Sequence, residues 1–254
     1  MIRQRYFFVA ALIAGLLALT AAPAKADLSI NAADAEFACA EEPVNCSIVN
    51  YPFATITSGT ETQGVRGMQR KTLAGWTGIG VDDGYVDGEI DRDGVEFIKI
   101  NYIDPVEKSS RSWWISEFTL AFLFQPGHHN DQVFEVAIAN PNGNYNEGRL
   151  RVTGDGTAIW EGLGANQVNP FAQVITRSDA VQTGGAGVFQ VINPFLAPAS
   201  EIYFKAAHQA GGTGAGDSDF AIVSVSAVPE PGAIVLLGTC ILAIVGGMRR
   251  RAKI

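Results

Sequence analysis

An acidic run between residues 82 and 96 contains the residue types best suited to binding a cation. The candidate ligands occupy every second position and are Asp87, Glu89, Asp91 and Asp93. Calcium binds six to eight oxygen atoms, which carboxylates and carbonyls on a turn can supply. An EF-hand is not expected, because its twelfth position would be Ile100 and no flanking helices are indicated. The run therefore fits either a calcium site on a loop between strands or a solvated turn.

The histidines give a weaker metal pattern. His128 and His129 are adjacent in a polar segment, and the only other histidine is His208. Zinc needs three or four protein ligands, so a solvated loop is favoured over a metal site. The sequence contains no HExxH, GxSxG or phosphate-binding glycine motif. Paired carboxylates for glycoside hydrolysis are invisible in sequence, so a secreted hydrolase stays a distant alternative.

Four tryptophans could stack on sugars if they were exposed: Trp76, Trp113, Trp114 and Trp160. Tryptophans within strands more often belong to the core. Trp113 and Trp114 are consecutive, so in a strand they point to opposite faces and at most one enters a single core. A carbohydrate-binding module is therefore an alternative function.

Cys39 and Cys46 have six residues between them. In an exported chain an oxidising compartment favours a disulfide between them. Chain entropy gives such a short loop a stabilisation of about 2.5 kcal/mol. Cys240 lies in an apolar segment and is expected to have no partner.

The first 26 residues have the pattern of a secretory signal peptide. Arg3 and Arg5 precede the apolar run Tyr6–Leu19. Small residues, Ala24 and Ala26, occupy the positions that signal peptidase requires, which predicts cleavage before Asp27. These small residues argue against the alternative of an uncleaved signal anchor.

The C-terminal segment predicts a membrane anchor. Residues 232–248 carry no charge, and a helix of that length spans roughly 25 Å, slightly short of a hydrocarbon core of about 30 Å. Arg249, Arg250 and Arg251 follow at once and can reach the headgroups. Positive charge on this flank alone orients the tail toward the cytoplasm and the body outward.

The order Val228-Pro229-Glu230-Pro231, apolar span and arginine cluster resembles a PEP-CTERM sorting signal. The resemblance covers about the last 27 residues. It implies a temporary anchor in the inner membrane that an exosortase cuts near Pro229-Glu230-Pro231. It also implies delivery to the cell surface or an exopolysaccharide matrix, with the catalytic residues on the exosortase. A plain C-terminal anchor is the alternative. The two prolines independently predict an extended segment outside the bilayer.

Composition restricts the partners of the body. The whole chain has a formal net charge of −8. Residues 27–228 keep 25 of the 26 acidic and 11 of the 18 basic residues, which gives −14. This charge argues against a nucleic-acid partner and predicts that the body avoids anionic surfaces.

The body, residues 27–227, reads as one all-β domain. Short β-branched and aromatic runs alternate with turn residues, and no segment shows a convincing helical stripe. Leu150 and Val152 alternate with Arg149 and Arg151, which predicts a strand with one wet face. This pattern favours a β-sandwich, jelly-roll-like, with the last strand at a sheet edge. The expected function is a surface or matrix structural protein without catalysis or a cofactor of its own. The alternative is a carbohydrate- or calcium-dependent binding module.

Overall fold

The computed structural model describes ten segments of the chain: residues 28–41, 46–62, 64–82, 88–91, 95–126, 134–143, 147–162, 168–180, 185–207 and 218–229. The predicted signal peptide up to Ala26, together with Asp27, lies outside these residues. So do Glu230, Pro231, the span 232–248 and the arginine cluster. Within the described segments, no helix is long and apolar enough to cross a membrane.

Two antiparallel sheets make up the fold, as the sequence pattern predicted for an all-β protein. Sheet I has the order β13-β14-β9-β16-β6-β5, with β1 and β7 also paired to β16. Its strands are β1 (Leu28–Asn31), β5 (Gly67–Leu73), β6 (Trp76–Asp82), β7 (Ile90–Asp91), β9 (Trp113–Ala121), β13 (Gln173–Ser178), β14 (Val188–Ile192) and β16 (Asp219–Pro229).

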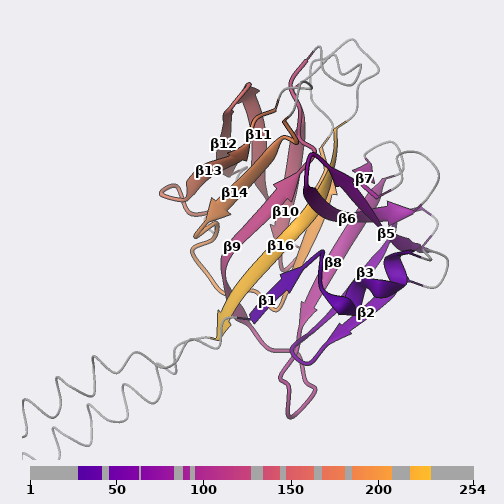
Figure 1. Cartoon of the computed structure of the whole chain (residues 1–254). Coiled ribbons are helices and arrows are strands. Elements are labelled where there is room, and N and C mark those ends of the chain that lie inside the picture. Colours follow the sequence, from indigo (N-terminus) through magenta and orange to yellow (C-terminus); the bar gives the residue numbers. More distant parts are fainter. Residues whose placement is uncertain are drawn as a thin grey trace, which may run out of the picture.

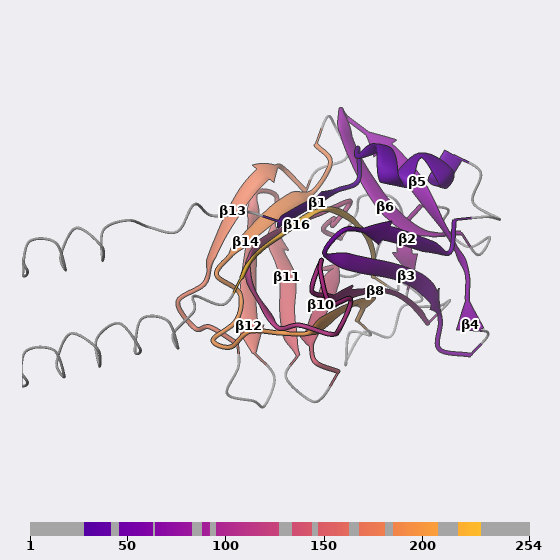
Figure 2. The same cartoon turned by 90° about the horizontal axis from the view of Figure 1, so that it is seen from below.

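Sheet II has the order β12-β11-β10-β15-β8-β3-β2, with β4 paired to β3. Its strands are β2 (Ile48–Tyr51), β3 (Ala54–Thr60), β4 (Gly64–Val65), β8 (Glu96–Tyr102), β10 (Val136–Pro141), β11 (Gly148–Gly154), β12 (Thr157–Gly162) and β15 (Glu201–Ala206). Figures 1 and 2 show the two sheets facing each other.

The inward faces of both sheets form one large hydrophobic core. Its largest fully buried side chains include Tyr102, Phe118, Phe189, Phe204 and Phe220. The alternation predicted for β11 is confirmed, since Leu150 and Val152 are buried while Arg149 and Arg151 are half-buried. A strand places successive side chains on opposite faces, so this local pattern is sufficient to orient it.

The prediction that the last strand lies at a sheet edge is wrong. β16 lies between β9 and β6, and β1 and β7 also pair with it. Its segment Ala221–Ala227 is buried at almost every position, with only Ser224 half-buried. Which strands pair depends on contacts between distant parts of the chain, and sequence periodicity does not report those contacts.

The hairpin of β5 and β6 was not predicted from the sequence. Both strands are rich in glycine and polar residues, which weakens a β pattern. Ala74 and Gly75 both have positive φ, at 49° and 83°, as a two-residue hairpin turn of the primed type requires. Gly78 is needed for close packing, because a Cβ there would lie 2.5 Å from the Cβ of Ala221.

Candidate functional site

Two of the four candidate calcium ligands lie inside the fold instead of on a solvated turn. Glu89 and Asp91 are buried, at 2% and 7% exposure, at the end of the sheets where β6, β7 and β16 meet. Asp91 is the register partner of Asp219 on β16. The other two candidates, Asp87 and Asp93, lie outside the described residues.

The buried Glu89 contacts a half-buried acid and a half-buried base from other strands. The Lys71 Nζ on β5 lies 2.7 Å from the Glu89 Oε1. The carboxyls of Glu89 and Asp219 are linked by a hydrogen bond. Burial, followed by the negative charge of Asp219, raises the pKa of Glu89 to about 8, and Lys71 only partly offsets this rise. The arrangement therefore keeps a proton on a buried carboxyl at neutral pH and joins β5, β7 and β16.

Backbone geometry explains how Glu89 reaches this position. The Val81 N–H donates to the Glu89 carbonyl at 2.8 Å, and the Gly88 N–H donates back to Val81 at 3.2 Å. A Cβ on Gly80 would lie 2.1 Å from the Glu89 nitrogen, so only glycine permits this approach. Gly88 has a φ of +82°, which also favours glycine.

A neighbouring carboxylate continues the acidic cluster. The Glu96 Oε2 on β8 accepts a hydrogen bond of 2.7 Å from the Asp91 backbone N–H. Glu96 is buried at 2% exposure. Within the part of the chain that the structure describes, no group of three or more His, Cys, Asp or Glu residues is placed to hold a metal ion. Sequence spacing included Glu96 in the acidic run but missed Lys71 and Asp219, which come from other strands.

The histidines for which a solvated loop was favoured over a zinc site, His128, His129 and His208, lie outside the described residues. All four tryptophans lie among the residues that the structure describes. Trp113 is buried and Trp114 is half-buried, as their adjacency predicted. Trp160 serves packing: its Nε1 donates to the Pro194 carbonyl at 3.1 Å, and its ring meets Phe118 and Phe195 edge-on. It borders a groove of about 640 Å³ together with Glu161, Val168, Asn169 and Leu196.

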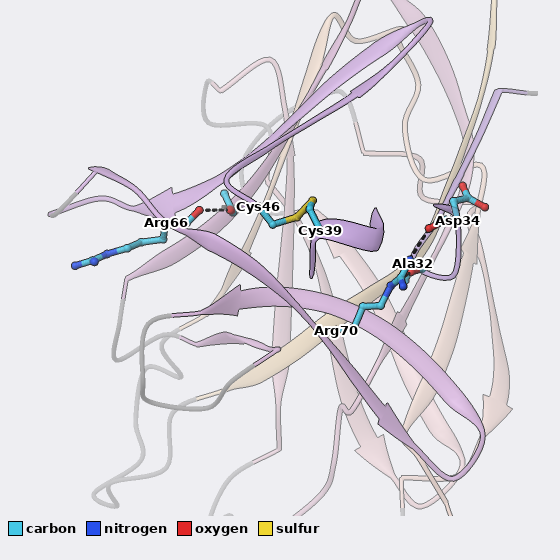
Figure 3. Close-up of a disulfide and its surroundings, with 7 residues drawn as sticks. Ala32, Asp34, Cys39, Cys46, Arg66 and Arg70 are labelled. Carbon is cyan, nitrogen blue, oxygen red and sulfur yellow. Dashed lines mark hydrogen bonds between the residues drawn. A yellow bond between two sulfur atoms is a disulfide. The ribbon is translucent and has the colours of Figure 1, made fainter. Parts of the chain in front are cut away.

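The predicted disulfide is present. Cys39 and Cys46 are joined, with their Cα atoms 5.1 Å apart (Figure 3). Cys39 lies on the 3₁₀-helix η1 (Ala35–Glu41), which packs against β2 at the edge of sheet II and β5 at the edge of sheet I. The Met68 N–H of β5 donates to the Cys46 carbonyl at 2.8 Å. The disulfide therefore fastens a short helix across one open side of the two sheets.

Arg70 holds the turn that leads into the same helix. Its Nε donates to the Ala32 carbonyl at 2.8 Å, and its second amino group donates to the Asp34 carbonyl. The opposite open side is closed by hydrogen bonds between β12, β13 and their flanking turns, such as Thr176 Oγ1 to the Gly156 carbonyl at 2.6 Å.

The first half of the proposed sorting motif belongs to the sheet. Val228 pairs with Trp114 and Pro229 pairs with Trp113, at the end of β16. Both backbone groups of Trp113 are bonded to Ala199, at 2.9 Å each, on the side away from β16. In an antiparallel strand, the N–H and the C=O of one residue point to the same side. Trp113 directs both toward Ala199, so its partner Pro229 on β16 does not need an N–H to bond β9.

Comparisons with protein-family models, with curated proteins and with solved structures found no match to this chain.

Proposed function

We propose that this chain is an exported protein that an exosortase sorts to the cell surface or an exopolysaccharide matrix, where it acts as a structural component without catalysis of its own. In this proposal signal peptidase removes residues 1–26, and the apolar segment 232–248 holds the body at the inner membrane until the exosortase acts. The body then remains on the outer side of that membrane, with the arginine cluster inside.

The observation that carries the proposal is the junction between the sheet and the tail. β16 ends at Pro229, the second residue of the motif Val228-Pro229-Glu230-Pro231, and the uncharged run begins three positions later at Gly232. Only Glu230 and Pro231 therefore separate the last strand from the predicted anchor. The Cys39–Cys46 disulfide adds support, because disulfides persist in oxidising compartments outside the cytoplasm.

We further propose that the body is a jelly roll. The strand orders β6-β16-β9-β14 and β8-β15-β10-β11 support this class, because the chain passes repeatedly from one sheet to the other. Strands β2, β3, β5, β12 and β13 then extend the two four-stranded cores. A jelly roll suits a structural component, because its paired strands leave few unprotected edges.

Mass spectrometry of the native protein tests the proposal. In cells that contain the exosortase, we expect a chain that begins at Asp27 and lacks residues 232–254. Deletion of the exosortase should leave the complete tail on the chain. Identical masses with and without the enzyme would contradict exosortase sorting, and a retained residue 1 would contradict export by signal-peptide cleavage.

A further inference from the structure

Both ends of the described chain leave the fold at the same end of the sheets. Leu28, the first residue of β1, pairs with Ala227, near the end of β16. Pro229 lies opposite Trp113, the first residue of β9. Figure 1 shows the start of β1 and the end of β16 close together. The predicted signal peptide and the predicted anchor would therefore join the body at one end.

Three connections lie at this same end. Segment 103–112 joins the end of β8 to the start of β9, segment 168–172 precedes β13, and segment 193–200 joins β14 to β15. The pairing places them together, since Trp113, the first residue of β9, pairs with Ala199 in segment 193–200, and Val168 pairs with Phe195. We call this end, formed by the three connections and the strand ends Leu28 and Pro229, the tether pole.

Large apolar side chains point into solvent at the tether pole. Val106 and Phe171 are each 86% exposed and are the two most exposed large apolar side chains of the described residues. Leu196 is 50% exposed. Each of the three connections therefore carries one apolar tip, although exposing a large apolar side chain to water is unfavourable. Apolar groups gathered on one face point to an interaction surface.

The fold holds these tips in place. Asp104 accepts hydrogen bonds from the backbone N–H groups of Val106 and Glu107, at 2.8 and 3.0 Å, and pairs with Arg111. These amide donors lower the pKa of Asp104, which keeps it charged. Asn169 accepts from the Phe171 N–H at 3.0 Å, and its own N–H donates to Pro194 at 2.9 Å.

The charge of the tether pole differs from that of the rest of the body. Segment 103–112 carries two acidic and two basic residues, and segments 168–172 and 193–200 carry no charged residue. Half of the described acidic residues lie at the opposite end: Glu61, Asp82, Glu89, Asp91, Glu96, Glu135, Asp155, Asp179 and Asp219. Glu147, Glu161 and Glu201 lie nearer the tether pole, and each is paired with a basic residue: Arg149, Arg151 and Lys99, respectively. In a body with a formal charge of −14, the tether pole can approach an anionic surface with little repulsion.

The tail is too short to keep this pole away from a membrane. Pro229 and Gly232, the first residue of the apolar run, are three residue steps apart, which is at most about 11 Å of extended chain. The headgroup layer of a bilayer is itself roughly 5–8 Å thick on each side. An anchor inserted at Gly232 therefore brings Pro229 to the headgroup surface, and in Figure 1 the connection between β8 and β9 extends beyond the strand ends.

We propose that the tether pole rests in the headgroup layer of the anchoring membrane, with Val106, Phe171 and Leu196 in contact with lipid. This inference depends on the proposed function, because it requires the tail to be inserted. Until the tail is cut, the acidic end then faces away from the bilayer, and the segment around Glu230 lies at the membrane surface. Single apolar tips bind weakly, so the contact is released when the covalent anchor is lost.

Spin labels on the full-length chain test the proposal. In a Cys240→Ala background, single cysteines are introduced by V106C, F171C, V65C or L237C and labelled with a nitroxide. Each chain is reconstituted into vesicles of phosphatidylethanolamine and phosphatidylglycerol. Relaxation of the nitroxide by oxygen, which enriches in lipid, is compared with relaxation by a water-soluble nickel chelate. Val65 is the matched control, because it is 62% exposed at the opposite end of the sheets.

We expect labels at positions 106, 171 and 237 to show a several-fold higher ratio of oxygen to chelate accessibility than the label at position 65. If position 237 reports lipid while 106 and 171 match position 65, the anchor is inserted but the docking inference is wrong. If position 237 also reports water, both the docking and the proposed membrane anchor are contradicted.

Discussion

Glu89 is a buried acid whose protonation is set by its burial and by charged groups on two other strands. Its carboxyl contacts Lys71 on β5 and Asp219 on β16, while Gly80 of β6 allows the close backbone approach. In the unfolded chain the same carboxyl has an ordinary pKa near 4.5, whereas the folded pKa is about 8. Folding therefore takes up a proton at this site between these two pH values.

This difference in pKa makes the free energy of unfolding depend on pH. The folded pKa is raised, so the contribution of Glu89 to stability is complete below about pH 4.5 and is lost as pH rises through 8. We expect E89Q to remove this dependence, so that its free energy of unfolding relative to the native chain rises by a few kcal/mol between pH 5 and 9. Urea titrations at several pH values measure it.

The control for this prediction is E107Q, because Glu107 lies on an exposed loop far from the cluster. E107Q should follow the pH profile of the native chain. A constant difference in stability between E89Q and the native chain over the same pH range would show that Glu89 titrates normally.

At the scale of elements, the short helix η1 closes one side of the sandwich. Its disulfide joins it to the segment that leads into β2, and Arg70 ties the turn before it to β5. The sequence predicted the disulfide, because the two cysteines are close together in a chain that is expected to reach an oxidising compartment. It did not predict that the disulfide fastens an element across both sheets, since this requires β2 and β5 to be edge strands.

Removal of the disulfide should destabilise the body. We expect the double variant C39A/C46A to lose about 2.5 kcal/mol of unfolding free energy, the value for closure of so short a loop. For about 200 residues, this corresponds to a fall in Tm of roughly 5–10 °C. The matched control is C240A, which should melt like the native chain. Equal Tm values for C39A/C46A and the native chain, with no effect of reductant on either, would rule out a stabilising disulfide.

At the scale of the whole molecule, the last strand completes the fold. β16 pairs with β9, β6, β1 and β7, so it is bordered by strands from the beginning and the middle of the chain. β12 and β2 each pair with a single strand and form the ends of sheet II. Central strands open only when much of the sheet opens, whereas edge strands open locally.

Hydrogen exchange measured by mass spectrometry checks this arrangement. Amides of β16 between Ala221 and Ala227 should exchange at least about tenfold more slowly than those of β12. β9, which lies between β14 and β16, serves as an internal standard for a central strand. Equal exchange rates for β16 and β12 would contradict the central position of β16 and would agree with the edge position that the sequence suggested.

The sequence by itself determined the all-β class, the orientation of β11 and the Cys39–Cys46 pair, because strand alternation and short-loop closure are local properties. Only the tertiary structure decided that β16 is central and that Glu89 meets Asp219. The gathering of Val106, Phe171 and Leu196 at one end also required it. These features depend on which strands pair and in which register, and segments far apart in the chain carry no local signal of their pairing.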